Sequence, residues 1–265
     1  MAISLLANES VCFTTTSGLY CHQREFGRKS TLKWKKDLLG VTSIASNEYQ
    51  IFAATRTDKL MMVDGTYTCW NIHILDDRTG SELRQIFGGL GQECSITALP
   101  CGWLALADTG NYGFHAQPCI ILMTEYGKER QVLTPMAHET SLVKPTKVVV
   151  NAERSKLVVF DGGANYLIGY DNLRTTLRTS WKLHAKNYVS MTVDSTNSVI
   201  VAAMRFSTDI MTFDGEVLSR IDLGWNREMV RDISVREKYL AASEGKEACI
   251  YRIVNVDDAK DDIEC

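Results

Sequence analysis

A strand pattern with a period of roughly 40 to 50 residues runs along this chain and constrains its fold more than any other feature. The steps between equivalent positions are 41, 52, 52, 43 and 42 residues, and the two longer steps indicate loop insertions. A second strand of small and β-branched residues follows each opening strand, as at 104–107 and 157–160. Such apolar runs are typical of strands covered on both faces. The equivalent positions are Ile3, Ile44, Ile96, Val148, Met191 and Ile233.

Four strand signals per period predict an all-β fold, a six-bladed β-propeller of four-stranded antiparallel blades. We expect a single propeller domain over residues 1–256 and an acidic, disordered tail over 257–265. The last unit shows no signal for a fourth strand, and residues 1–6 are already used by the first unit, so either the chain is cut from a longer one before Met1 or the ring closes loosely. We therefore expect a domain of a larger protein. The expected blades span residues 1–36, 37–90, 91–135, 143–184, 187–223 and 228–256.

Hairpin turns and two tryptophans support the internal repeat. Asp214-Gly215 separates two apolar runs, and a Gly at such a turn readily adopts positive φ. Thr79-Gly80 occupies an equivalent place. Trp34 and Trp181 each end a fourth strand, ten residues before the next unit's marker position. The match places the two tryptophans at equivalent positions of the repeat.

Composition favours a compact protein outside the membrane. Hydrophobic residues make up 45% and charged residues 23%, which argues against disorder over most of the chain. The apolar runs are far shorter than the roughly 18 residues that span a bilayer. The eight cysteines include no Cys-x-x-Cys pair, which favours buried, reduced thiols and a cytoplasmic location.

Catalytic motifs are missing from the sequence. His138-Glu139 begins a zinc-protease pattern, but Leu142 stands where the second histidine is required. Gly89-Leu90-Gly91 is followed by Cys94 where a dinucleotide loop needs glycine. We expect no catalytic residues, no metal site and no cofactor, and hence a protein that is not an enzyme.

An apolar strand followed by Asp and then Asn occurs twice. Asp108 with Asn111, and Asp161 with Asn165, follow the second strands of two units. Such side chains accept hydrogen bonds from nearby backbone amides, so we expect them to fix turns rather than to act as acids. The pattern resembles the NHL repeat, the propeller unit at the carboxyl end of tripartite-motif (TRIM-NHL) ubiquitin ligases.

The NHL resemblance implies a binding face built from the loops between second and third strands and between units. Cations and aromatic residues are expected there, as residue types that anchor a protein partner or stack single-stranded RNA. The predicted ligand-binding residues are Lys36, Arg56, Lys59, Tyr112, Phe114, His115, Lys186, Tyr188, Arg205, Phe206, Trp225 and Arg227.

Three functions follow as hypotheses. The first is a non-catalytic platform that recruits a protein partner, as the substrate-recognition part of a ubiquitin ligase. The second is a propeller that binds single-stranded RNA, but a net charge of −3 and a pI near 6.0 argue against it and against DNA. The third is a metal-dependent hydrolase or lyase, for which only Asp194 and Asp232 approach suitable inward positions.

Overall fold

Strands β1–β23 form the regular structure of the chain in the computed structural model. Within the described residues no helix is long and apolar enough to cross a bilayer. At 57–62, 65–68, 87, 172–173, 244, 247 and 252 only the backbone is described. The structure describes residues 1–8, 10–23, 30–62, 65–87, 93–99, 102–110, 117–128, 130–139, 141–173, 176–185, 188–204, 207–222, 230–237, 239–244 and 247–252. The expected tail at 257–265 lies outside them.

The first half of the chain forms three antiparallel groups of four strands, each paired in chain order. The first group is β1 (Ile3–Leu5), β2 (Ser10–Thr15), β3 (Gly18–Gln23) and β4 (Thr31–Lys36). The second is β5 (Val41–Ser46), β6 (Gln50–Met62), β7 (Gly65–Asp76) and β8 (Glu82–Phe87). The third is β9 (Cys94–Leu99), β10 (Trp103–Asp108), β11 (Cys119–Thr124) and β12 (Arg130–Pro135).

The second half repeats this order, and its last group has three described strands. The groups are β13 (Pro145–Val150), β14 (Lys156–Asp161), β15 (Tyr166–Leu173) and β16 (Thr176–His184); then β17 (Tyr188–Asp194), β18 (Val199–Met204), β19 (Thr208–Met211) and β20 (Val217–Ile221). The last is β21 (Val230–Arg236), β22 (Tyr239–Glu244) and β23 (Glu247–Arg252). Residues 253–265, where a further strand of this sheet would follow, lie outside the described residues.

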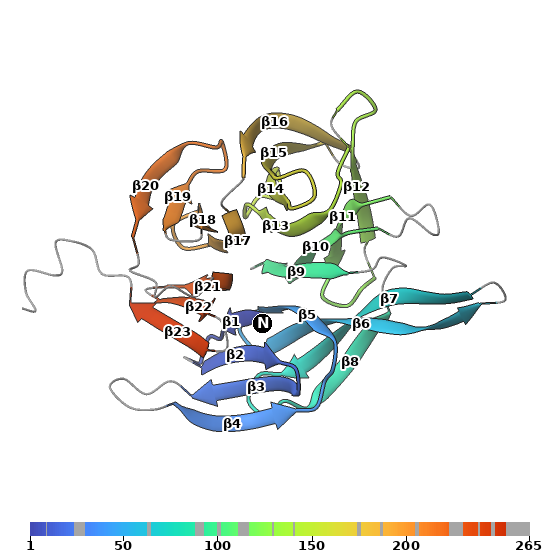
Figure 1. Cartoon of the computed structure of the whole chain (residues 1–265), viewed down its shortest axis with the longest axis vertical. Coiled ribbons are helices and arrows are strands. Elements are labelled where there is room, and N and C mark those ends of the chain that lie inside the picture. The colour runs from blue at the N-terminus through green and yellow to red at the C-terminus, as the bar shows by residue number, and fades with distance from the viewer. Residues whose placement is uncertain are drawn as a thin grey trace, which may run out of the picture.

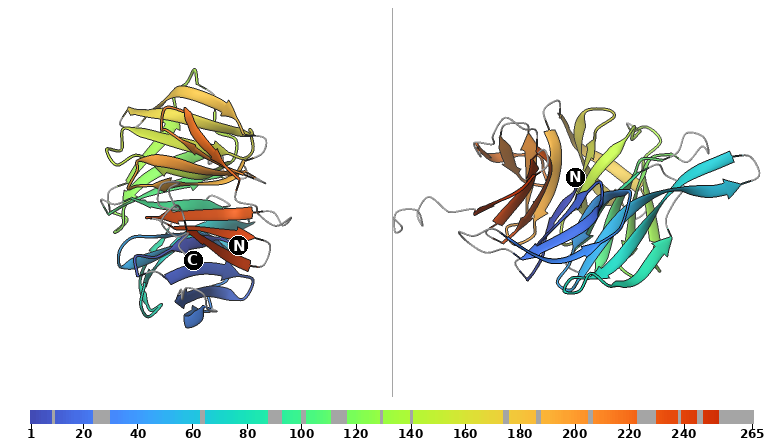
Figure 2. Two further views of the ribbon diagram at one scale, coloured as in Figure 1. Left: turned by 90° about the vertical axis from the view of Figure 1, so that its left-hand side faces the viewer. Right: turned by 60° about the horizontal axis from the view of Figure 1, so that its bottom comes forward.

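The sheets stand around a common centre as the blades of a β-propeller (Figure 1). The first strand of each blade faces the centre and the last strand lies at the outside, while the β6–β7 hairpin projects from the ring (Figures 1 and 2). Two blades are joined directly, because β12 pairs in parallel with β16 at Thr134–Thr176 and Pro135–Leu177. The predicted all-β propeller is therefore confirmed.

Each hydrophobic cluster lies between two consecutive blades, so neighbouring blades share their cores. The β1–β4 and β5–β8 blades, for example, bury Leu19 and Ile51 in one cluster. The ring closes in the same way, because Ile3 and Val11 of the first blade pack with Ala241 of the last. Among the described strands, those of the first blade pair only with one another. Packing and not strand exchange therefore closes the described part of the ring.

Trp34 of β4 fastens the first blade to the second. Its indole Nε1 donates a hydrogen bond to the backbone oxygen of Asp77, 3.1 Å away, in the β7–β8 turn. The ring lies on Gly80, whose φ is +70°, and a Cβ there would come within 2.6 Å of the indole carbon Cε3. Glycine is thus required at this position by both the backbone conformation and the tryptophan.

Trp181 of β16 makes the same joint between two later blades. Its Nε1 donates to the backbone oxygen of Phe213 at 2.9 Å, and a Cβ on Gly215 would lie 2.7 Å from the indole carbon Cδ2. The equivalence predicted from sequence spacing is confirmed. In the β5–β8 blade an isoleucine takes this place, because Ile86 lies against Gly127 of the next hairpin.

Replacing Gly80 with alanine tests the joint. Gly80→Ala combines an unfavourable left-handed φ with a steric clash, so we expect the free energy of unfolding to fall by about 3 kcal/mol in urea titrations. Gly102→Ala is the matched control, because Gly102 has a φ of +74° but its nearest neighbour, the Glu125 carboxyl, would lie 3.8 Å from the new Cβ. It should cost only about 1 kcal/mol. Equal losses in the two variants would show that the tryptophan contact contributes nothing.

Candidate functional site in the central channel

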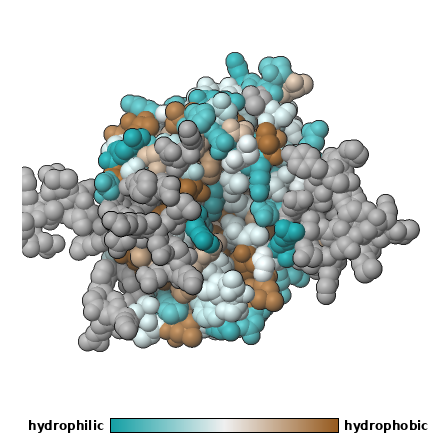
Figure 3. Space-filling model, in the orientation of Figure 1, coloured by the Kyte–Doolittle hydropathy of each residue, from teal (hydrophilic) through white to brown (hydrophobic). Residues whose placement is uncertain are grey.

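A cavity of about 540 Å³ occupies the centre of the ring and is lined by the innermost strands. That volume lies within the range of small-molecule and side-chain binding pockets. Pale and teal residues, of intermediate and hydrophilic character, gather around the middle of the ring in Figure 3. Five of the marker positions from the repeat form an apolar layer at one end of the cavity. These residues are Ile3, Ile44, Ile96, Met191 and Ile233.

A layer of hydroxyl groups follows toward the other end of the cavity. Ser46 Oγ donates to the backbone oxygen of Leu5 at 2.9 Å, and Ser4 Oγ lies 3.0 Å from Ser46 Oγ. Ser234 Oγ accepts a hydrogen bond from the Leu5 amide at 3.1 Å. Thr97 Oγ1 donates to a backbone oxygen of the following blade at 2.6 Å. These hydroxyls connect neighbouring innermost strands, which do not pair with each other as strands.

A buried ion pair lies beside the apolar layer. Lys147 Nζ of β13 is 2.7 Å from Asp232 Oδ1 of β21, and the side chains are only 17% and 6% exposed. Ser190 Oγ donates to the same carboxylate oxygen at 2.7 Å, and the Ile3 amide donates to Oδ2 at 3.2 Å. Asp232 thus connects β13, β17 and β1 to the last blade. Because the charge of Asp232 is paired and both of its carboxylate oxygens have partners, we assign this side chain to holding the blades together.

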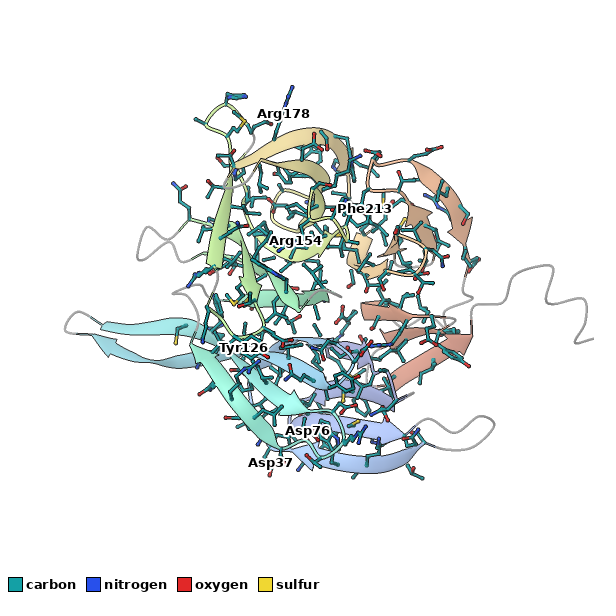
Figure 4. The ribbon with its side chains drawn as sticks, turned by 180° about the vertical axis from the view of Figure 1, so that it is seen from behind. Asp37, Asp76, Tyr126, Arg154, Arg178 and Phe213 are labelled. Atoms are coloured by element: carbon teal, nitrogen blue, oxygen red, sulfur yellow. The ribbon has the colours of Figure 1, made fainter. Side chains whose placement is uncertain are left out.

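The cavity opens at the turns between first and second strands. Exposed residues of these turns, including Glu48, Tyr49 and Glu237, line this mouth. Figure 4, drawn from behind, shows Tyr126, Arg154 and Phe213 in turns of the blades around the ring. The mouth lies at the ends of the innermost strands.

Asn47 organises the mouth. Its Nδ2 donates to Glu125 Oε2 at 3.1 Å, and its Oδ1 accepts from the Gln50 amide at 2.8 Å. Arg236 Nη1 of the last blade donates to the backbone oxygen of Asn47 at 3.4 Å. These hydrogen bonds connect three blades at the rim of the cavity.

The aspartates that follow second strands act as expected in turns. Asp161 Oδ1 accepts from the amides of Lys144 at 2.8 Å and of Gly163 and Ala164 at 3.1 Å. The prediction that these residues fix turns is confirmed for Asp161.

Asp108 has the same role with an additional partner. It accepts from the Gly110 amide at 2.9 Å and from the buried Trp70 Nε1 at 2.8 Å. Burial raises the pKa of the Asp108 carboxyl, although the bond from Trp70 acts to lower it. Asp194 also fixes a turn, since its Oδ1 accepts from the Thr196 amide at 3.0 Å. Within the described chain, no three His, Cys, Asp or Glu side chains gather as metal ligands.

Three of the predicted binding residues have described side chains. Lys36 is the last residue of β4, and Arg56 lies in β6. Both residues adjoin the connection between β4 and β5, because the Arg56 amide donates a hydrogen bond to the backbone oxygen of Gly40 in that connection. Tyr188 begins β17 in a later blade. These residues lie at the end of the ring opposite the mouth of the cavity. For Lys59 only the backbone is described, and outside the described residues lie Tyr112, Phe114, His115, Lys186, Arg205, Phe206, Trp225 and Arg227.

Tyr188 is engaged within its own blade. Its hydroxyl donates to Asp209, a fully buried carboxylate that also receives Arg220 Nε at 2.6 Å. Burial acts to raise the pKa of the Asp209 carboxyl, but the hydrogen bonds from Arg220 and Tyr188 outweigh it and hold that pKa below its usual range. Burial and the bond to Asp209 raise the pKa of the Tyr188 phenol. The tyrosine therefore supports the blade.

The described cysteines are free thiols, as expected. Cys12, Cys21, Cys69 and Cys94 are buried, and Cys119 is partly buried. Burial raises the pKa of the Cys119 thiol to about 12. A raised pKa keeps a thiol protonated and weakly reactive.

Sequence reasoning missed the mouth and the Lys147 pair. One signal for the pair was available, because the residue before each marker position is Ser43, Ser95 or Ser190 in three units and Lys147 or Asp232 in two others. Two opposite charges at positions that otherwise hold three serines and Ala2 indicate an inward ion pair. No comparable signal joins Asn47 to Glu125.

Comparisons with known proteins identify the fold. No protein-family model matches the chain, and no curated protein sequence is significantly similar to it. Among solved structures, the chain resembles a propeller from the nidogen/laminin complex, with a TM-score of 0.67 and 12% identity over 92% of this chain and 89% of that chain. It also resembles the Cps50 (Swd1) β-propeller domain of Myceliophteria thermophila, with a TM-score of 0.57 and 11% identity over 96% and 97%. Likeness at this identity shows the propeller fold.

The buried ion pair predicts a double-mutant result. Lys147→Met leaves Asp232 charged and buried, so we expect the free energy of unfolding to fall by about 3 kcal/mol. Adding Asp232→Asn removes that charge and keeps an acceptor for the Ile3 amide, so most of the loss should be recovered. Lys144→Met is the surface control and should change stability by less than about 1 kcal/mol. A double variant no more stable than Lys147→Met contradicts this role.

The Asp209 cluster predicts a pH dependence. Its lowered folded-state pKa contributes stability above the unfolded value of about 3.9, and this is lost as pH falls through the folded pKa. Arg220→Gln should therefore lower the free energy of unfolding at pH 7, and the difference from the unmodified chain should narrow below about pH 4. Arg178→Gln, an exposed control, should show no such narrowing. A pH-independent difference for Arg220→Gln would refute the electrostatic role.

Proposed function

We propose that the chain is a non-catalytic, six-bladed propeller that recruits a protein partner in the cytoplasm. The observation that carries the proposal is the propeller fold shared with a propeller of the nidogen/laminin complex, a complex between proteins. Propellers present rigid loops around a ring, and rigid loops bind with a small loss of conformational entropy. The free, buried cysteines support the cytoplasmic location.

The state of the buried carboxylates supports a non-catalytic role. Asp161 binds backbone amides, Asp108 binds a tryptophan and Asp232 pairs with a lysine. General acids and bases need a carboxyl group that can reach a substrate, and these groups are directed to the protein itself. We therefore assign them to stability.

The NHL-like repeat leads us to propose the loop face around Lys36 and Arg56 as a partner surface. Arg56 is exposed beside the β4–β5 connection, and Leu39 in that connection is 69% exposed. A cation next to an exposed apolar side chain is a combination found at protein interfaces. In a longer protein with a ligase module, this face would select substrates for ubiquitination.

Partner capture with matched charge reversals tests the function. A protein captured by the chain from a cell extract is purified, and its affinity is then measured with the purified chain. The double variant Lys36→Glu, Arg56→Glu should weaken binding at least ten-fold. The control pair Lys128→Glu, Arg178→Glu, which alters exposed cations elsewhere, should bind like the unmodified chain.

Fluorescence anisotropy with a pool of short single-stranded RNAs tests the alternative function, RNA binding. Micromolar RNA binding that weakens with salt and disappears in the Lys36, Arg56 double variant would overturn the protein-platform proposal in favour of an RNA-binding propeller. Absence of RNA binding together with partner binding supports the platform.

A further inference from the structure

We infer that the mouth of the central cavity is a second docking site, which takes in a basic segment of a protein partner. The inference rests on the proposed partner-binding function, but it concerns the end of the ring opposite the Lys36 and Arg56 face. It is carried by the shape of the cavity, by the charges of its rim and by two exposed tyrosines.

The cavity is deep enough to hold side chains. Its lining extends from Lys147 and the apolar layer, through the hydroxyl layer, to exposed turns such as that of Glu48 and Tyr49. Its 540 Å³ exceeds the volume of one extended lysine or arginine side chain several-fold. A segment bound across the mouth can therefore direct a side chain inward.

The described residues of the rim carry an excess of negative charge. Glu48, Glu125 and Glu237 line the mouth, and the ion pairs of the described residues involve none of them. Among the described residues that line the rim, Arg236 is the cation, while Lys147 in the depth is already paired with Asp232. An acidic rim raises the local concentration of cations and repels acidic ligands.

Tyr49 adds an aromatic surface to this rim. Its side chain is 65% exposed, and a hydrogen bond with Glu48 raises the pKa of its phenol. A ring held beside a carboxylate offers both a face for a cation and a counter-charge for it. Tyrosine is also enriched among residues that dominate protein interfaces.

Tyr126 extends the surface onto the next blade. It is 59% exposed, and the guanidinium of Arg84 lies 4.2 Å from its ring centre. Arg84 also donates to the backbone oxygen of Glu125 at 3.0 Å. With Glu125 in turn bound to Asn47, the two tyrosines stand on one hydrogen-bonded frame. A rigid frame reduces the entropy lost on binding.

The lining also favours a ligand that donates hydrogen bonds. Gln50 lines the cavity, and its Oε1 is buried with no donor among the described residues. The carboxylates of the rim are acceptors only. Lysine and arginine side chains supply donors and positive charge together, so a basic peptide segment fits this mouth better than an acidic or purely apolar one.

Peptide binding measured by fluorescence anisotropy tests the inference. The probe is a fluorescein-labelled twelve-residue peptide of alternating Lys and Gly, and the control probe carries Glu in place of Lys. We expect the Lys peptide to bind the full chain at least ten-fold more tightly than the Glu peptide, with affinity that falls as salt rises. Equal binding of the two peptides, or tighter binding of the Glu peptide, would overturn the inference.

Variants locate the binding. Tyr49→Ala and the double variant Glu48→Gln, Glu237→Gln should each weaken the Lys peptide about ten-fold, a loss of about 1.4 kcal/mol. All three side chains are exposed, so the variants should keep the unfolding midpoint of the unmodified chain. Glu216→Gln, an exposed acid in the β19–β20 turn away from the lining, is the matched control and should bind normally. Normal binding by the rim variants would refute the site.

The two proposals fail in different ways. If the captured partner is lost in the Lys36, Arg56 variant but rim variants leave both partner and Lys peptide bound, the inference is wrong and the platform stands. If the rim variants alone weaken the partner, the inference holds and the partner surface moves to this end of the ring.

Discussion

The innermost strands face a channel with no neighbouring strand, and the rest of the ring depends on how their backbone is satisfied there. A buried backbone amide without a partner costs free energy, so side chains must supply the missing bonds. Ser43 Oγ accepts from the Ile96 amide of the following blade at 3.1 Å, and Asp232 accepts from the Ile3 amide. Side chains on one innermost strand thereby satisfy the backbone of the next, and this fixes the spacing of the blades around the centre.

Farther from the channel, the packing of apolar side chains connects neighbouring blades. Each blade buries both faces against its neighbours, which accounts for the alanine-rich and β-branched second strands. Trp34 and Trp181 then fasten the outer strands to glycines of the following hairpins. Hydroxyl groups therefore connect neighbouring blades near the channel, and the two tryptophans connect neighbouring blades near the outside of the ring.

Residue patterns that repeat from blade to blade could be predicted from the sequence. The marker positions, the Trp34 and Trp181 equivalence and the turn role of Asp161 all depend on neighbours within one or two units of the repeat. The mouth of the cavity could not be predicted, because Asn47, Glu125 and Arg236 lie in turns or at a strand end far apart in the chain. The packing of consecutive blades brings Asn47 to Glu125, and closure of the ring brings Arg236 to Asn47. The engagement of Tyr188 by Asp209 was missed although both residues lie in one blade, because the aspartate is two strands away and no spacing pattern connects the two residues.

The parallel pairing of β12 with β16 makes one joint between blades different from the other joints of the described ring. It merges two blades into one eight-stranded sheet, whereas the first and last blades meet through the cluster around Ile3 and Ala241 and through side-chain bonds from Asp232 and Ser234 to the backbone of β1. Backbone hydrogen bonds across the first joint resist shear along the strands, and a side-chain contact does so less. The joint made by β12 and β16 is therefore stiffer than the joints without strand pairing, and a load applied across the ring is relieved at those other joints.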